Sequence, residues 1–195
     1  MSLKTSQLNE LPDQILRRGI LYIGRETYRI GEFEIYYHST EFPDPYVHSD
    51  PLQQEFGKVY FHRFKNGSYK GGTRKGMDLT LGQNGYSLSL LIRTIQHISS
   101  GQIITGPCNV VDHILQQVGY PSLSELILGA GGDISYLEMN PYLYLEISEL
   151  CVKSDIWSGS RHGLSDKYPQ FQNVAWRYVS DLVKTKVKNH TTLRK

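Results

Sequence analysis

The sequence predicts an α+β fold with more extended strands than helices, and three features indicate it. Polar and apolar side chains alternate along residues 28–37, as is typical of a strand. Asn66-Gly67, between the strand-like stretches 58–64 and 77–81, has the residue types of a two-residue hairpin turn. Residues 106–117 carry apolar side chains at helical spacing, namely Val110, Val111, Ile114 and Leu115.

The other elements follow from the same patterns. Residues 7–18 have apolar side chains at helical spacing, with Pro12 near the start, which predicts a packing helix. A turn at 24–27 separates a short strand at 20–23 from the central strand at 28–37, and two prolines fix the loop 41–46. Further strands are expected at 86–95, 142–147 and 173–179, with a short helix at 123–128.

The chain is long enough to form one domain. It has 195 residues, 39% of them hydrophobic, and shows no internal repeat, so we expect a single domain over 1–195. The last stretch, 184–195, is basic and polar, and we expect it to fray.

Several protein classes are excluded by what the sequence lacks. No apolar run approaches 18 residues, and the polar stretch Met1 to Glu10 is not a signal peptide. Cys108 and Cys151 are too few for a disulfide scaffold, which favours a reducing compartment, cytoplasmic or nuclear, over secretion. No zinc spacing, P-loop, dinucleotide fingerprint or serine-nucleophile elbow is present, so we expect no metal and no cofactor.

The central strand carries an unusual polar face. Glu34 and Tyr36 are two positions apart and would stand side by side at roughly 6–7 Å, with Glu32 and Ile30 on the same face. A carboxylate beside a ring suits chemistry on a flat heterocycle, although a solvent-facing strand would give the same pattern. Arg93 interrupts the apolar strand 86–95, and burying it requires a carboxylate partner, for which Glu34 and Asp78 are the candidates.

Positive charge is concentrated in one hairpin. Residues 58–75 contain six Lys or Arg and no acid, interleaved with aromatic rings. Such a pattern is typical of a nucleic-acid surface, where cations contact phosphates and rings stack or wedge, although a solvated basic hairpin is the alternative. The expected nucleic-acid contacts are Arg63, Lys65, Tyr69, Lys70, Arg74 and Lys75.

Six short motifs in order, over about residues 15 to 180, resemble the methylpurine (3-methyladenine) DNA glycosylase family, the type without a helix-hairpin-helix. None of them is specific alone, but their order is preserved. The motifs are Glu34-Ile35-Tyr36, Val47-His48-Ser49, Val59-Tyr60-Phe61-His62, Leu91-Ile92-Arg93-Thr94, Gly106-Pro107-Cys108 and Trp176-Arg177-Tyr178.

The resemblance implies a central, mostly antiparallel sheet curved around a nucleic-acid groove, with flanking helices. It implies an enzyme that flips a damaged purine out of duplex DNA and hydrolyses its N-glycosidic bond. We expect the protein to be a monomer. By position, Glu34 would be the general base and Arg93 would help hold the attacking water. Tyr36 and His48 would sandwich the base, and Tyr60 or His62 would complete the pocket.

This chain departs from the family pattern at two places. Asp78 stands where the family has a pocket asparagine, and a carboxylate accepts hydrogen bonds without donating them. The basic hairpin is longer, so Phe64 and Tyr69 are both candidates for the residue that wedges into DNA. Two other functions therefore stay open: a nucleic-acid binder that does not catalyse, and a hydrolase acting on free nucleosides or nucleotides.

Overall fold

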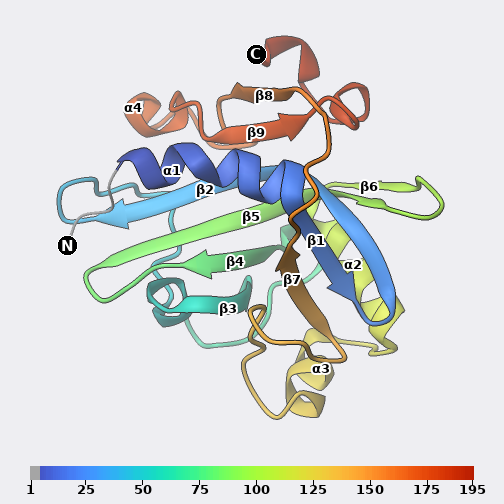
Figure 1. The fold of residues 1–195 in the computed structure, drawn as a ribbon. Coiled ribbons are helices and arrows are strands. Elements are labelled where there is room, and N and C mark those ends of the chain that lie inside the picture. Colours follow the sequence, from blue (N-terminus) through green and yellow to red (C-terminus); the bar gives the residue numbers. More distant parts are fainter. Residues whose placement is uncertain (1–4) are drawn as a thin grey trace.

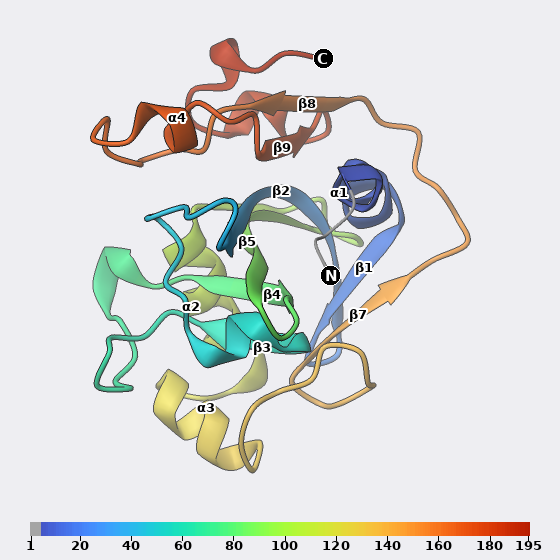
Figure 2. The same ribbon diagram turned by 90° about the vertical axis from the view of Figure 1, so that its left-hand side faces the viewer.

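One antiparallel sheet organises the computed structural model, which describes residues 5–195 (Figure 1). Its main path runs β3-β4-β5-β2-β1-β7. In addition, β6 pairs with β5, and β9 pairs with both β2 and β8. The sheet curls into a half-barrel around the core (Figure 2). The strands are β1 (Gly19–Ile23), β2 (Glu26–Ser39), β3 (Phe56–Phe61), β4 (Met77–Leu81), β5 (Tyr86–His97), β6 (Ile103–Thr105), β7 (Leu143–Ile147), β8 (Ile156–Gly159) and β9 (Arg177–Ser180).

Short helices accompany the antiparallel sheet, which confirms the predicted α+β class with a mostly antiparallel sheet. The α-helices are α1 (Thr5–Pro12), α2 (Pro107–Val118), α3 (Leu123–Gly129) and α4 (Pro169–Gln172). A π-helical turn, Asp13–Arg18, continues α1, and 3₁₀ turns lie at Pro51–Gln54, Gly72–Arg74, Lys184–Lys186 and His190–Thr192. No helix of residues 5–195 is long and apolar enough to cross a membrane. Residues 1–4, part of the predicted polar N-terminus, lie outside the described residues.

The core lies between one face of the sheet and α2. Phe33 and Ile35 of β2, together with Leu90 and Ile92 of β5, pack in the same cluster as the apolar face of α2. Gly119, with φ +76°, ends α2 in the left-handed region that glycine adopts without strain. The helix predicted at 106–117 is thus present, one residue longer at its C-terminus.

A β-bulge in β2 changes which side chains share a face. The register with β5 shifts between Ile30 and Glu32 and again between Glu32 and Phe33. The extra residue rotates the strand, because a bulge opposes two residues to one. Ile30 therefore lies in the core with Phe33, and the prediction that it shares the face of Glu32 and Glu34 was wrong.

The C-terminal segment is packed, so the expectation of a frayed end at 184–195 was wrong. Val187 and Leu193 are 4% and 6% exposed and cluster with Val179 and Val183. Arg194 also exchanges backbone hydrogen bonds with Ser158 at 2.6 and 2.8 Å. Because the segment is mostly basic and polar, its composition did not indicate that these two apolar residues would be buried. Strand boundaries also differ from the prediction, because β3 ends at Phe61 and β9 begins only at Arg177, after the unpredicted helix α4.

Gly31 at the bulge lets the C-terminal segment approach β2. A Cβ atom on Gly31 would lie 2.7 and 2.9 Å from the two methyl carbons of Val183. We expect Gly31→Ala to lower the free energy of unfolding by about 1–3 kcal/mol through overpacking. Val183→Ala should rescue part of that loss, with a coupling of at least about 0.5 kcal/mol in urea denaturation.

Gly71→Ala is the matched control, because a Cβ atom added at Gly71 would meet no atom of the described chain within 4 Å. It should change stability by less than about 0.5 kcal/mol. Equal destabilisation by both glycine substitutions, or additivity with Val183→Ala, would contradict this account of the bulge.

Candidate functional site

The polar face of the sheet, opposite the core, gathers the predicted site residues. Leu91 of β5 pairs with Glu34 of β2 on one side and with Asp78 of β4 on the other. Tyr60 of β3 lies opposite Asp78. Antiparallel pairing thus places on four neighbouring strands the side chains that the sequence spreads over about 60 residues.

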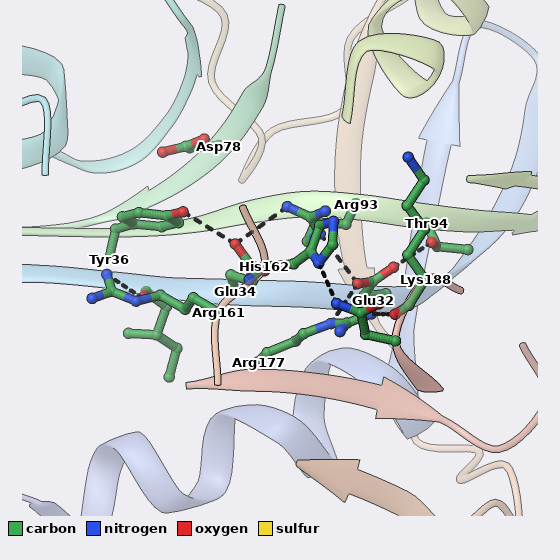
Figure 3. A network of polar contacts seen from close by, with 12 residues as sticks. Glu32, Glu34, Tyr36, Asp78, Arg93, Thr94, Arg161, His162, Arg177 and Lys188 are labelled. Carbon is green, nitrogen blue, oxygen red and sulfur yellow. Dashed lines mark hydrogen bonds and ion pairs between the residues drawn. The ribbon is translucent and has the colours of Figure 1, made fainter. Parts of the chain in front are cut away.

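Glu34 and Arg93 are in contact at the centre of this face (Figure 3). Arg93 Nη1 lies 3.3 Å from Glu34 Oε2, and the Tyr36 hydroxyl donates to the same oxygen at 3.1 Å. The backbone N–H of His162 donates to Oε1 at 2.6 Å, and the glutamate is 0% exposed. Burial raises the pKa of Glu34, against the opposing effects of Arg93 and the two hydrogen bonds.

A second carboxylate, Glu32, completes a charge network behind Glu34 (Figure 3). Its Oε1 accepts from Arg93 Nε at 3.1 Å and from Arg177 Nε at 2.8 Å, and its Oε2 accepts from the Thr94 hydroxyl at 2.7 Å. Two carboxylates and two guanidiniums are thus buried together, and their formal charges cancel when Glu34 is ionised. Arg177 also donates to the carbonyl of Lys188 at 2.6 Å, which links the network to the C-terminal segment.

Arg161 supports Tyr36 from behind the ring. Its guanidinium carbon lies 4.7 Å from the centre of the Tyr36 ring, and its Nη2 lies 2.7 Å from Asp44 Oδ2 as a fully buried ion pair. Arg161 Nη1 and Nη2 also donate to the carbonyls of Ile35 and Phe171. The orientation of Tyr36 is therefore fixed by a cation that does not reach Glu34.

A pocket of about 150 Å³ opens on the other side of Tyr36. Three of the side chains that the resemblance assigned to a base pocket line it, together with Asp78. Glu34 is not among the lining residues, whereas Tyr36, which donates to Glu34, is. The lining residues are Tyr36, Tyr46, His48, Gln53, His62, Asp78 and Leu164.

Asp78 is 2% exposed and accepts from three side chains. His62 Nε2 lies 2.8 Å from Oδ1, the Ser89 hydroxyl donates to Oδ2 at 2.7 Å, and Gln53 Nε2 donates to Oδ2 at 3.4 Å. Asp78 is not paired with Arg93, which instead contacts Glu32 and Glu34. Of the two partners that the sequence offered for Arg93, Glu34 is therefore the one present.

His48 lies at the mouth of the pocket between a phenol and an ammonium group. Its Nδ1 is 3.1 Å from the Tyr60 hydroxyl and its Nε2 is 2.9 Å from Lys70 Nζ. Burial, with help from His62 and Lys70, lowers the pKa of His48 to about 4. The neutral ring then accepts from Lys70 at Nε2 and donates from Nδ1 to Tyr60.

A wider groove of about 830 Å³ adjoins the pocket at His48 and follows the basic hairpin. Its walls combine aromatic, basic and small residues: Ser49, Asp50, Pro51, Tyr60, Arg63, Phe64, Lys65, Gly67 and Lys70. Lys65 is exposed, whereas Arg63 is held by Asp50 through two hydrogen bonds of 2.7 and 2.6 Å.

The other hairpin residues predicted to contact nucleic acid lie outside the groove lining. Arg74 is exposed with its guanidinium 5.3 Å from the centre of the Phe64 ring, and Lys75 pairs with Asp112. Tyr69 is partly buried against the core, whereas Phe64 is 39% exposed. Phe64 is therefore the better placed of the two wedge candidates.

Sequence reasoning did not assign roles to Arg161, His162 and Arg177. Arg161 and His162 lie in a stretch to which no role was assigned, and Arg177 appeared only within the motif Trp176-Arg177-Tyr178. Their roles depend on long-range contacts, since His162 is 128 residues from Glu34 and Arg177 is 145 residues from Glu32. Among the residues that the structure describes, no group of three His, Cys, Asp or Glu could hold a metal ion.

Removing one buried cation should show how strongly the network depends on charge balance. We expect Arg177→Leu to lower the free energy of unfolding by about 3–5 kcal/mol, because Glu32 loses a buried partner. Arg25→Leu, at an exposed position, should change it by less than about 0.5 kcal/mol in the same denaturation assay. Comparable losses for the two variants would show that Arg177 is not needed to balance Glu32.

The environment of His48 predicts its titration. By NMR, the His48 ring should titrate near pH 4 instead of near its ordinary 6.5, and Lys70→Gln should raise that pKa. Because the folded-state pKa is depressed, neutral His48 favours the folded state above pH 6.5, and this contribution is lost as the pH falls toward 4. Lys65→Gln is the control and should leave the midpoint unchanged; a wild-type midpoint between about pH 6 and 7 would contradict this prediction.

Comparison with known proteins gives a family but no activity. No protein-family model matches the chain. Over 206 aligned positions it is 35% identical to a protein of Acanthamoeba polyphaga mimivirus, described as "Uncharacterized protein L759", and the alignment covers 99% of this chain and 94% of the relative. Identity at this level over nearly the whole of both chains means that the chain belongs to the same protein family as this mimivirus protein.

Proposed function

We propose that the protein is a DNA N-glycosylase that hydrolyses the N-glycosidic bond of a damaged purine flipped out of duplex DNA. The observation that carries the proposal is the contact between Arg93 Nη1 and Glu34 Oε2, which are 3.3 Å apart. Glu34 is hydrogen-bonded to Tyr36, which lines a pocket that adjoins a basic groove. The motif order supports the same assignment. The mimivirus relative carries no functional description and adds no support.

In this mechanism Glu34 accepts a proton from a water molecule whose oxygen attacks the anomeric carbon. The bond to the base breaks, and its electron pair leaves with the base. Positive charge develops on the sugar ring in the transition state, and the buried carboxylate stabilises this charge. A raised pKa of Glu34 brings this base closer to neutrality, where general-base catalysis is most efficient.

Glu34 must become accessible before this step, because its side chain is fully buried. The segment that covers it also lines the pocket: His162 donates to Glu34 Oε1, and Leu164 is part of the pocket wall. We propose that the entering nucleotide displaces this segment or the Tyr36 ring, which admits water to the carboxylate. The same movement would connect the pocket with the catalytic pair.

The adjoining groove suits a nucleic-acid backbone. Lys65 and Lys70 provide cations for phosphates, and the exposed Phe64 ring can stack on or wedge between bases. His48 belongs to both the groove and the pocket, so a nucleotide leaving a duplex in the groove would pass this ring.

Glu34→Gln should separate chemistry from binding. On duplexes carrying one hypoxanthine, ethenoadenine or methylated purine, we expect the variant to lose about 10²–10⁴-fold in excision rate. Its affinity for the same duplexes should remain within a few-fold, with Glu55→Gln, at an exposed position, as the control. The wild-type rate should fall on the acid side at a pH above the ordinary pKa of a glutamate, 4.5, because protonation removes the base.

The full burial of Glu34 also favours a second candidate, a nucleic-acid binder in which the charge network is only structural. That candidate predicts salt-dependent DNA binding, no abasic product from any of these lesions at high protein concentration, and no effect of Glu34→Gln beyond stability. Release of base from free nucleosides at a comparable rate would count against both candidates.

A further inference from the structure

The polar groups that line the pocket are nearly all engaged by other protein groups. The Tyr36 hydroxyl donates to Glu34, and the Tyr46 hydroxyl donates to the carbonyl of Ser165 at 2.5 Å. Both ring nitrogens of His48 are paired, with Tyr60 and Lys70. These three side chains therefore offer a ligand no uncommitted hydrogen-bond donor, although the Tyr36 hydroxyl oxygen can still accept.

The Gln53 amide is committed as well. Its Nε2 donates to Ser89 Oγ at 2.9 Å and to Asp78 at 3.4 Å, which uses both of its hydrogens. Its Oε1 accepts from the backbone N–H of Asp50 at 3.1 Å, where it forms part of a capping box. Gln53 thus holds Asp78 in place and has no hydrogen left for a ligand.

Asp78 keeps unused acceptor capacity. A carboxylate offers about four acceptor sites, and three are filled: two on Oδ2 by Ser89 and Gln53, and one on Oδ1 by His62. His62 is held in turn, because its ring packs against the backbone of Gly76, where an added Cβ would lie 2.5 Å from the ring. One acceptor site on Oδ1 therefore stays available at a rigid position in the wall.

Asp78 is also the one carboxylate among the residues that line the pocket. Arg161 already stacks on the Tyr36 ring at 4.7 Å, and Lys70 sits on His48, so both cations reduce the attraction of these rings for a positively charged ligand. Selection for charge at this pocket must come from Asp78 and not from the aromatic faces.

From this geometry we infer that Asp78 selects a heterocycle that presents an N–H donor or a positive charge to it, and rejects one that presents a carbonyl oxygen. The inference rests on the proposed function in taking the ligand to be a purine. An adenine-type base with its exocyclic amine fits, whereas a hypoxanthine-type base would place its oxygen against a buried carboxylate. Two acceptors facing each other leave both unpaired, which lowers affinity.

Free bases test this selection without any DNA chemistry. The 9-methyl derivatives of adenine and hypoxanthine lack the N9–H donor that the free bases share and differ at C6, and wild-type protein should bind 9-methyladenine about 10- to 100-fold more tightly by ligand-detected NMR or calorimetry. Asp78→Asn supplies a donor of the same shape and should reduce or reverse the ratio, while Asp133→Asn, at an exposed position, should leave it unchanged. Urea denaturation of each variant checks that the fold is intact.

A parallel excision assay separates this inference from the proposed function. With duplexes carrying one 3-methyladenine or one hypoxanthine, the wild-type rate ratio should favour 3-methyladenine, and Asp78→Asn should lower that ratio at least about 10-fold. Base selection by the free protein without excision from any duplex would refute the glycosylase and leave the selection standing. Equal binding of the two bases by wild type, binding of neither, or a ratio unaffected in folded Asp78→Asn would overturn the selection. If that variant does not fold, the wild-type ratio alone decides.

Discussion

The structure depends on an irregularity in the pairing of β2 with β5. Gly31 is the extra residue on β2 and Arg93 is the extra residue on β5, on either side of the Glu32–Thr94 pair. Ile30 and Phe33 therefore both lie in the core, while Glu32 and Glu34 lie outside it in the charge network. Without the extra residue, a strand of strict alternation would bury one set and expose the other. The same place lets β9 pair with β2 from Glu32 to Glu34, which brings Arg177 to Glu32. A local irregularity thus assembles the charge network.

Tyr36 contacts both the charge network and the pocket. Its hydroxyl donates to Glu34, the Arg161 guanidinium lies over its ring, and the ring lines the pocket. Because Arg161 is paired with Asp44 and His162 follows it directly in the chain, the loop that orients Tyr36 also supplies the amide that covers Glu34. Movement of this loop would therefore change the ring and the carboxylate together, which is the coupling that a ligand-gated catalytic site requires.

The sequence was sufficient for elements whose signals are local. The apolar spacing of α2 and the alternation of β4 indicated the right elements, and Glu34 is one of the two partners that the sequence offered for the arginine inside β5. The two-residue turn predicted at Asn66-Gly67 was wrong in its length, because Phe64 N–H donates to the carbonyl of Ser68 and only Gly67 has a positive φ. The sequence did not predict the bulge, because a bulge is defined by the register between two strands and the sequence of one strand does not show that register. Arg161, Arg177 and the packed C-terminal segment escaped for a related reason: their roles come from contacts made across more than a hundred residues, or from two apolar residues within a basic stretch.

The composition of the network bears on the proposal that Glu34 is catalytic. Burying four ionised groups costs desolvation energy that their mutual attraction only partly offsets, and apolar residues of similar volume often stabilise a fold as well or better. Glu32 is satisfied by Arg93, Arg177 and Thr94, and Glu34 supplies the second negative charge that balances the two guanidiniums. Glu34 adds a carboxylate whose raised pKa reflects that desolvation, and it accepts a hydrogen bond from Tyr36, which lines a pocket that adjoins a basic groove. Ionisable groups with perturbed pKa values near a cleft are typical of functional sites. The position of Glu34, more than its pairing, therefore supports the proposal that it is the reactive group.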